Sequence, residues 1–292
     1  MKPPPFEYLD PATLDEALDL LAEAPDDSAV IAGGQSLVPL LNLRLARPER
    51  VVDPRRIERF HELRVDHTGV HAGALVTAGD LERHPACRDV SGLAEALALI
   101  GHPQIRNRTT VGGSIAHADP AAELPALLLA TDGSVTLHSR ALGERVVAAS
   151  ALFEGPFTTC RRSDELLTSV TIPAVAGRVT VLEVAARPGD FATVGVVVGA
   201  LLDDGTVAEA RIVAFGVAGT PIRLSGVEQQ LIGAPAEHAP DLASTAVREQ
   251  LDAAGDEHTS ADYRRHVAGT LVARALRQLC ATDDQAPSEV AP

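Results

Sequence analysis

Two short segments far apart in the sequence each contain two consecutive glycines and a serine. They are residues 31–37 (Ile-Ala-Gly-Gly-Gln-Ser-Leu) and residues 110–120 (Thr-Val-Gly-Gly-Ser-Ile-Ala-His-Ala-Asp-Pro). Glycine allows the backbone to approach a ligand closely and to adopt positive φ, so that successive N–H groups can converge on an anion. Two such segments could hold the two ends of one pyrophosphate. The pattern therefore predicts a dinucleotide site that lacks the Gly-x-Gly-x-x-Gly fingerprint.

Carboxylates accompany the second glycine segment. Asp119 lies near its end and Glu123 follows four residues later, and both side chains are suited to accept hydrogen bonds from ribose or ribityl hydroxyls. Neither segment contains lysine. We therefore expect backbone N–H groups and helix N-termini to meet the anion.

Each of these residues also has a purely structural interpretation. The glycine pairs could simply permit turns, and Ser36 and Ser114 could only cap helices. Asp119 before a proline is also an ordinary acid at a helix N-terminus. We interpret His117 as a packing or hydrogen-bonding residue in preference to a proton donor.

The elements expected around the first glycine segment place it between a strand and a helix. Residues 28–32 are predicted to form a buried strand and residues 37–45 a helix, and a helix that follows a glycine turn is a favourable anion site. Thr13 is predicted to cap an earlier helix, with Glu16 completing a capping box. Further strands are expected at 51–53, 70–78, 135–138, 145–148 and 166–172, and helices at 91–100 and 121–130.

Residues 173–177 (Pro-Ala-Val-Ala-Gly) are predicted to link this half to a second domain. Beyond them, strands are expected at 180–186, 193–202 and 207–215, with an Asp-Asp-Gly turn at 203–205 between the last two. Helices are then expected at 225–232, 241–254 and 260–280. The last residues, 283–292, are rich in Asp, Pro, Ser and Glu and are predicted to be disordered.

Composition restricts the classes of function. The 292 residues are 46% apolar with no tryptophan, and their formal charge is −15; this acidic balance argues against binding of nucleic acid. Three cysteines occur singly, so we expect neither a metal site nor an iron–sulfur cluster within the chain; we interpret Cys87, Cys160 and Cys280 as inert thiols. No apolar run resembles a signal core or a membrane span, and a cytoplasmic location is expected.

Together these segments resemble the FAD-binding medium subunit of molybdenum hydroxylases, of the carbon monoxide dehydrogenase type and related to the xanthine dehydrogenase FAD subunit. The resemblance rests on residues 32–37 and 110–123. It extends to Arg-Asn-Arg at 106–108, Arg-Pro-Gly-Asp-Phe-Ala at 187–192 and Ser-Ala-Asp-Tyr-Arg-Arg-His at 260–266. The matching segments span nearly the whole chain.

The resemblance implies an α+β architecture. A two-lobed FAD-binding domain of the vanillyl-alcohol-oxidase (PCMH) type would occupy residues 1–175. A smaller domain with a three-stranded antiparallel sheet and helices would occupy residues 178–282. Arg106 and Arg108 could be solvated or could contact a partner subunit.

The resemblance also implies which residues bind the cofactor. The glycine segments would hold the FAD pyrophosphate, Asp119 and Glu123 would lie along the ribityl and ribose, and Leu167 would pack against the cofactor. Phe191 stands near the isoalloxazine ring where relatives often have tyrosine, although it could equally be plain core. The full set is Ile31, Ala32, Gly33, Gly34, Gln35, Ser36, Leu37, Thr110, Val111, Gly112, Gly113, Ser114, His117, Asp119, Glu123, Leu167 and Phe191.

The implied function is electron transfer within a three-component enzyme, with FAD held non-covalently. A large subunit would oxidise the substrate at a molybdenum cofactor, and a small subunit would relay electrons through [2Fe–2S] clusters to this subunit. The assembly expected is a dimer of heterotrimers. No side chain is expected to act as a catalytic nucleophile or base, and the substrate could be carbon monoxide, a purine, an N-heterocycle or an aldehyde.

Two other functions remain open. A self-contained flavin oxidase of the same fold would need its own substrate pocket, and many such oxidases tether FAD through His or Cys, which the first glycine segment lacks. A cofactor-free scaffold would not require the glycines and acidic residues. Retention of FAD and its release by acid would distinguish the three.

Overall fold

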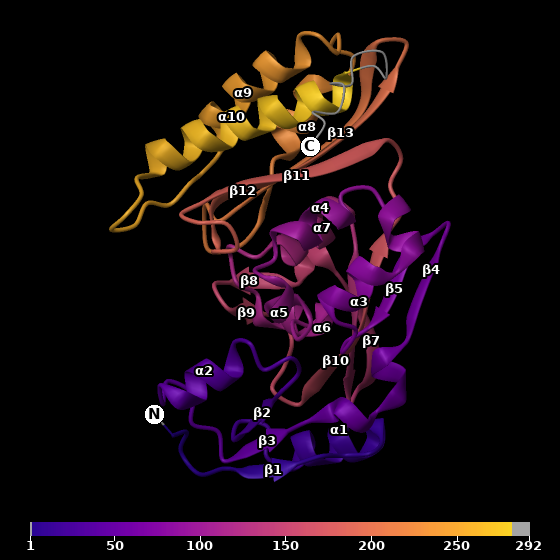
Figure 1. Ribbon diagram of the computed structural model, residues 1–292, viewed down its shortest axis with the longest axis vertical. Helices are drawn as coiled ribbons and strands as arrows, with labels where there is room; N and C mark the ends of the chain where they lie inside the picture. Colours follow the sequence, from indigo (N-terminus) through magenta and orange to yellow (C-terminus); the bar gives the residue numbers. More distant parts are fainter. Residues whose placement is uncertain (1, 282–292) are drawn as a thin grey trace, which may run out of the picture.

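The computed structural model describes residues 2–281, and three sheets follow one another along its long axis (Figure 1). A small parallel sheet lies at the N-terminal end and an antiparallel sheet with short helices lies in the middle. A second antiparallel sheet, covered by long helices, lies at the other end (Figure 1). The first two sheets form the two lobes expected for the N-terminal domain.

The N-terminal lobe is a parallel sheet with strand order β1-β3-β2. Thr13 caps α1, since its hydroxyl accepts from the Glu16 N–H at 3.2 Å, and one side of that helix is buried. The expected capping box is only half formed, because the Glu16 carboxylate accepts instead from the N–H of Ala12. The elements are β1 Glu7–Leu9, α1 Leu14–Glu23, β2 Ser28–Val30, α2 Leu37–Asn42, β3 Arg50–Val52 and the 3₁₀ helices η1 Pro54–Arg56 and η2 Glu58–His61.

The middle lobe is an antiparallel sheet with strand order β4-β5-β10-β6-β7. Its strands are β4 Leu63–Asp66, β5 Gly69–Gly73, β6 Ser134–Ser139, β7 Gly143–Ala148 and β10 Glu165–Pro173. Its helices are α3 Ala78–Arg83, η3 Pro85–Asp89, α4 Leu93–Leu99, α5 Pro103–Arg106, α6 Val111–His117, α7 Glu123–Ala130 and η4 Ala149–Ala151. A separate ribbon joins β8 Phe153–Gly155 to β9 Thr158–Thr159. Every residue of α7 is buried, so this helix forms the centre of the molecule.

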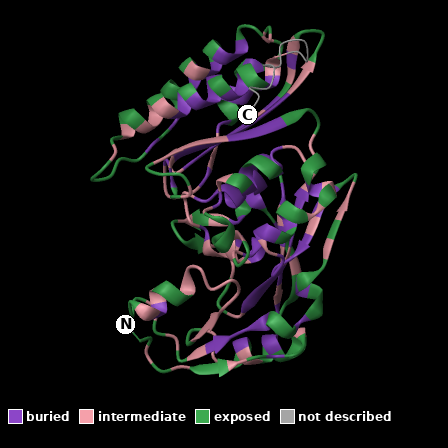
Figure 2. Ribbon diagram, viewed as in Figure 1, coloured by how far each residue is buried: buried purple, intermediate pink, exposed green. Residues whose placement is uncertain are grey.

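The C-terminal domain is an antiparallel sheet with helices on its outer face. The sheet contains β11 Arg178–Ala185, β12 Ala192–Asp203, β13 Thr206–Phe215 and β14 Ile222–Arg223. The helices are α8 Ser225–Leu231, α9 Ala239–Gln250 and α10 Ala261–Cys280. Figure 2 shows buried residues along the sheet-facing sides of these helices. The opposite face of the sheet packs on α4 and α7.

The structure corrects several expected boundaries. The C-terminal sheet contains the three expected strands and a fourth, β14, whose two residues are too short to give a sequence pattern. The second glycine pair lies inside α6 and does not form an open loop. The helix expected at 37–45 ends at Asn42, and Pro173 still pairs with Gly69 in the sheet. The expected disorder of residues 283–292 lies outside the described residues.

Candidate functional site

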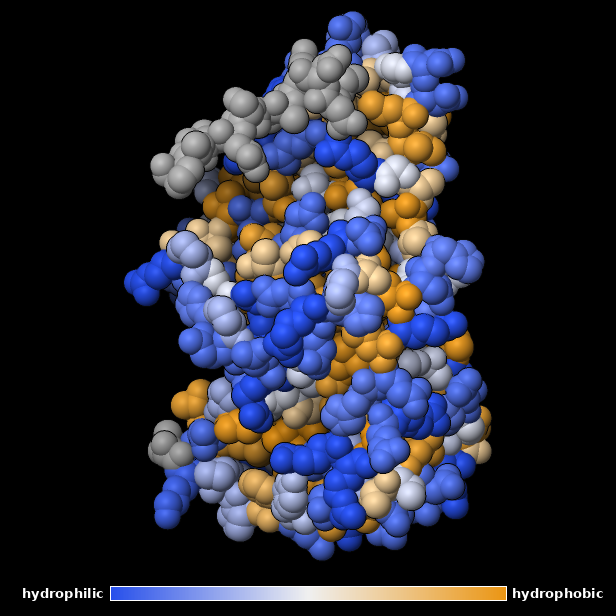
Figure 3. Space-filling view, turned by 45° about the vertical axis from the view of Figure 1, so that its right-hand side comes forward, coloured by the Kyte–Doolittle hydropathy of each residue, from blue (hydrophilic) through white to orange (hydrophobic). Residues whose placement is uncertain are grey.

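A cavity of about 500 Å³ lies between the lobes, with both glycine segments in its wall. This volume falls within the roughly 300–1,000 Å³ typical of small-molecule and cofactor sites. Residues 189–191, which precede β12, also line it. The C-terminal domain therefore contributes to the site. The space-filling view shows apolar patches among the hydrophilic surface of one side of the molecule (Figure 3).

The first glycine segment presents a row of unused backbone donors. Its strand ends with the Ile31 N–H, which donates to the Val52 carbonyl at 2.9 Å. Within the described part of the chain, none of the six N–H groups from Ala32 to Leu37 donates to a protein acceptor. Gly34, at φ +74°, turns the backbone so that these groups precede α2. Consecutive free N–H groups of this kind form an anion-binding concavity.

The two glycine segments lie directly against each other. A Cβ at Gly33 would stand 1.9 Å from the Arg108 carbonyl oxygen, and one at Gly113 would stand 3.2 Å from the Cβ of Ala32. The Arg108 Nε also donates to the Gly33 carbonyl at 3.3 Å. Glycine is therefore required here for close packing of the segments, in addition to any role in a turn.

The backbone of the second glycine segment is already engaged. The N–H groups of Val111 and Gly112 donate to carbonyls of residues 76 and 74, and that of Gly113 donates to the Thr110 hydroxyl at 3.1 Å. The expectation that both segments offer free glycine N–H groups is therefore wrong for Gly112 and Gly113. Gly112 and Gly113 still line the cavity, together with Ser114 and His117 of the same segment.

The acidic residues differ in environment. Asp119 accepts a hydrogen bond from the Ala121 N–H at 2.9 Å through one carboxylate oxygen. Glu123 begins α7 and is only 6% exposed; burial raises its pKa to about 8, and the negative charges of Glu183 and Asp119 add to the rise. Burial also lowers the pKa of His117, whose ring lies 5.1 Å from that of Phe157.

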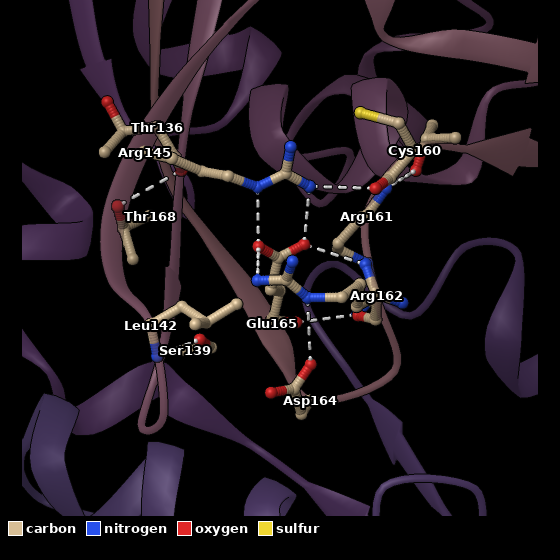
Figure 4. Close-up of polar contacts among 11 residues, drawn as sticks. Thr136, Ser139, Leu142, Arg145, Cys160, Arg161, Arg162, Asp164, Glu165 and Thr168 are labelled. Carbon is tan, nitrogen blue, oxygen red and sulfur yellow. Dashed lines mark hydrogen bonds and ion pairs between the residues drawn. The ribbon is translucent and has the colours of Figure 1, made fainter.

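A cluster around Glu165 supports the cavity wall (Figure 4). Its carboxylate is fully buried and accepts from Nε and Nη2 of Arg145 at 2.7 and 2.8 Å. The backbone N–H and Nη2 of Arg162 donate to it as well, each at 2.8 Å. Burial opposes ionisation, but the hydrogen bonds from Arg145 and Arg162 outweigh it and lower the pKa of Glu165.

Arg161 supplies the only Lys or Arg side chain of the cavity wall among the described residues. Its Nη1 donates to the carbonyls of Arg162 and Glu165 at 2.9 and 2.6 Å, which fixes the guanidinium. Burial lowers its pKa from the usual arginine value. Sequence reasoning missed this residue, although two consecutive arginines in a strongly acidic chain could have drawn attention to it.

All the predicted site residues line the cavity except Ile31 and Val111. Ile31 packs beside Gly34, and Val111 is fully buried in the core. Phe191 is 65% exposed and is therefore not a core residue. Further lining residues that were not predicted include Leu40, Leu75, Ile100, Gly101, Ile105, Arg161, Glu165, Leu166, Gly189 and Asp190.

Two other sequence expectations concern metals and membranes. Over residues 2–281, no group of three or more His, Cys, Asp or Glu side chains is arranged to hold a metal ion. In the same range, no helix combines the length and apolarity needed to cross a membrane.

The cysteine thiols are affected by burial. Burial raises the pKa of the Cys87 thiol to about 11 and raises the pKa of the Cys280 thiol as well.

Comparison with known proteins identifies the family. Residues 4–175 match the FAD binding domain in molybdopterin dehydrogenase, and residues 181–279 match the CO dehydrogenase flavoprotein C-terminal domain. The chain belongs to this family of FAD-binding subunits.

Several members are similar to this subunit over nearly their whole length. Caffeine dehydrogenase subunit beta of a Pseudomonas species is 38% identical over 94% of the chain and 95% of its own length. The carbon monoxide dehydrogenase medium chain of Hydrogenophaga pseudoflava is 36% identical over 94% of the chain and 97% of its own length. The crystal structure of quinoline 2-oxidoreductase from Pseudomonas putida 86 superimposes with a TM-score of 0.90 at 34% identity, covering 96% of this chain and 98% of that one.

The cavity of this FAD-binding subunit fits the cofactor of its family. The free N–H groups of residues 32–37 suit a pyrophosphate, and a Cβ at Gly33 or at Gly112, which would stand 2.7 Å from the Ala74 Cα, would disrupt the wall. Apolar side chains such as Leu166 and Leu167 provide surface for the ring systems. The expected family and two-part fold are thus confirmed.

Proposed function

We propose that this chain is the electron-transfer subunit of a heterotrimeric molybdenum hydroxylase of the carbon monoxide dehydrogenase type. Bound FAD would accept electrons from the [2Fe–2S] clusters of a small partner subunit and pass them to an external acceptor. A large partner subunit would carry the molybdenum cofactor and select the substrate. The assembly proposed is a cytoplasmic dimer of heterotrimers.

The row of free N–H groups from Ala32 to Leu37 is the observation that carries the proposal. These donors would bind the pyrophosphate, and in a wall otherwise rich in carboxylates the Arg161 guanidinium would add the positive charge that favours an anionic ligand. Asp119 and Glu123 would bind hydroxyls of the ribityl and ribose. Non-covalent binding is proposed because these contacts are all hydrogen bonds or packing.

The apolar part of the wall would hold the isoalloxazine ring. Leu167 is 6% exposed in β10, and Phe191, on the turn before β12, lines the same cavity. An exposed aromatic side chain at the cavity edge offers a flat surface on which a ring can stack. These residues would exclude water from one side of the ring and orient it, and no side chain is assigned a bond-making role.

Purification of the complex from its native host tests this function. We expect one FAD per chain after gel filtration, released by acid, together with a large molybdenum-containing and a small iron–sulfur polypeptide. FAD that stays attached after acid treatment would support a self-contained covalent oxidase. A colourless chain that cannot be reconstituted with FAD would support the scaffold and contradict the proposal.

A further inference from the structure

The turn that follows α4 forms part of the cavity wall. Ile100 and Gly101 both line the cavity, and Gly101 turns the chain at φ +44° before α5 begins. A Cβ at Gly101 would lie 3.1 Å from the Cβ of Ile105, so the turn also packs closely on α5. The position of this turn therefore helps to define the shape of the cavity.

Arg106, the last residue of α5, binds both carbonyls of this turn. Its Nη1 donates to the carbonyl oxygens of Ile100 and Gly101, each at 3.1 Å. Its Nε and Nη2 donate to the two carboxylate oxygens of Glu82 in α3, at 2.9 and 3.0 Å. The sequence left open whether Arg106 is solvated, and its side chain is only 11% exposed. The planar guanidinium thus links α3 to the turn in a fixed geometry, which a lysine ammonium cannot reproduce.

The C-terminal domain contacts the same turn. A Cβ at Gly189 would lie 2.9 Å from Cε1 of the His102 ring and 3.3 Å from the carbonyl carbon of Gly101. Gly189, at φ +83°, lines the cavity together with the two residues that follow it, Asp190 and Phe191. Contact with the turn after α4 therefore sets where Phe191 stands at the cavity edge.

We propose that Arg106 is a positioning residue of the cofactor site, which holds the turn after α4 so that this turn sets the place of Phe191 against FAD. Arg106 itself does not line the cavity, so it acts through its neighbours. This inference rests on the proposed FAD-binding function, in which Phe191 offers a surface to the isoalloxazine ring. It requires that the contribution of Arg106 to FAD affinity disappears when the Phe191 ring is removed.

A double-mutant cycle on FAD affinity, measured with the full chain, tests this requirement. Phe191→Ala removes the stacking surface and should weaken FAD binding by up to about tenfold. Arg106→Lys keeps the charge but loses the planar fork, and should weaken FAD binding by a comparable or smaller factor. The doubly substituted protein should bind FAD no more weakly than Phe191→Ala alone. Two effects that multiply would mean that Arg106 acts by another route, and would overturn the inference.

Arg83→Lys is the matched control. Arg83 also bridges α3 and the end of α5, since its Nη1 donates to the Asn107 Oδ1 at 3.0 Å and its Nη2 donates to Asp80 at 2.8 Å. These hydrogen bonds do not involve the turn after α4. Arg83→Lys should therefore leave FAD affinity unchanged.

ADP binding distinguishes positioning of Phe191 from general damage to the site. ADP contains the pyrophosphate but not the isoalloxazine ring, so Arg106→Lys should bind ADP as tightly as the unaltered protein does. Equal losses of ADP and FAD affinity in Arg106→Lys would overturn the inference.

Hydrogen exchange of the cofactor-free chain tests the contact independently of FAD. Arg106→Lys should increase amide exchange in residues 99–103 and also in residues 187–192, whereas Arg83→Lys should leave both segments unchanged. Glu82→Gln, at an exposed position, should produce the same pattern to a smaller degree, and it serves as the second variant if Arg106→Lys does not fold. Unchanged exchange in residues 187–192 would overturn the inference.

The two proposals fail in different ways. Failure of FAD to bind the unaltered protein would contradict the proposed function. Hydrogen exchange would then still report whether Arg106 holds the C-terminal domain at the cavity edge.

Discussion

At the scale of single residues, the first glycine segment is proposed to bind the FAD pyrophosphate through its backbone N–H groups, and a side chain at Gly33 would interfere with this. A Cβ at Gly33 would lie 1.9 Å from a backbone oxygen, which no rotamer change can relieve. Such overpacking typically costs about 1–3 kcal/mol. If the strain displaces the row of N–H groups, Gly33→Ala should weaken FAD binding about 10- to 100-fold. Fluorescence titration with FAD measures this effect.

The matched control is Gly155→Ala. A Cβ at Gly155 would have its nearest neighbour 4.0 Å away, and its φ is not in the positive region. This variant should bind FAD normally and melt at the same temperature as the unaltered protein. Equal affinities for Gly33→Ala and Gly155→Ala would mean that the first glycine segment is only a turn.

Arg161 offers a second prediction, because its charge is held in the cavity wall without a carboxylate partner within the described residues. A hydrogen bond to a charged group contributes about 1.5–3 kcal/mol. Arg161→Leu should therefore weaken FAD binding about 10- to 100-fold, and Arg161→Lys less. Titration with ADP and with riboflavin locates the contact: weaker ADP binding assigns it to the pyrophosphate, and weaker riboflavin binding to the ring.

The control for Arg161 is Arg47→Leu, an exposed arginine that hydrogen-bonds only a local carbonyl and does not line the cavity. It should leave all three affinities unchanged. If Arg161→Leu also leaves them unchanged, the guanidinium does not contact the cofactor.

Residue types and spacing predicted the part of the cavity wall that the two glycine segments form, because these segments are local patterns. Arg161 was missed for a different reason. Its place in the cavity wall depends on how the turn before β10 packs between the lobes, and no local sequence pattern indicates that packing.

At the scale of secondary-structure elements, Glu165 connects β10 to β7 and to the turn before β10. Its fully buried carboxylate receives four hydrogen bonds from Arg145 and Arg162. Glu165→Gln removes the negative partner of Arg145 and leaves Arg162 paired only with Asp164, whose Oδ1 lies 3.5 Å from the Arg162 Nε. Because both arginines are partly exposed, we expect a loss of about 2–3 kcal/mol in the free energy of unfolding at pH 7. Urea denaturation followed by circular dichroism measures it.

The pH dependence of this loss has a definite sign. The pKa of Glu165 is lowered in the folded protein, so its contribution is present above the unfolded pKa of about 4.3 and is lost as pH falls through the folded value. The difference between Glu165→Gln and the unaltered protein should therefore shrink below about pH 4. Glu144→Gln is the control, since Glu144 is exposed and pairs only with His138. A difference that stays constant down to pH 3 would contradict the assignment.

Element boundaries were predictable where local chemistry determines them. The Thr13 cap of α1 is confirmed. The sequence did not predict that Gly112 and Gly113 are helical, because their conformation depends on hydrogen bonds to residues 74 and 76. It also missed β14, whose two residues become a strand only by pairing with Val213 and Ala214.

At the scale of the whole molecule, the two domains share one hydrophobic core. Val197, Val213 and Phe215 of the C-terminal sheet belong to the same cluster as Leu124 and Leu127 of α7. A continuous core across the junction implies that the domains unfold together, although two family models match them separately.

Apolar packing and an ion-pair cluster both connect the domains. The contribution of each to the free energy of unfolding decides which of the two dominates. Phe215 is fully buried against α7, so Phe215→Ala should cost about 3–5 kcal/mol. Asp132 contacts Arg211 and Arg223 across the junction but is 58% exposed, so Asp132→Asn should cost less than about 1 kcal/mol. Asn tolerates the φ of +55° at position 132, so the backbone is preserved.

Urea unfolding measures both effects. Each variant should still unfold in a single transition. The midpoint should move to a much lower urea concentration for Phe215→Ala, and only slightly lower, in a salt-dependent manner, for Asp132→Asn. Two separated transitions, or a larger loss for Asp132→Asn, would mean that charge pairing and not the shared core holds the C-terminal domain against the cofactor site.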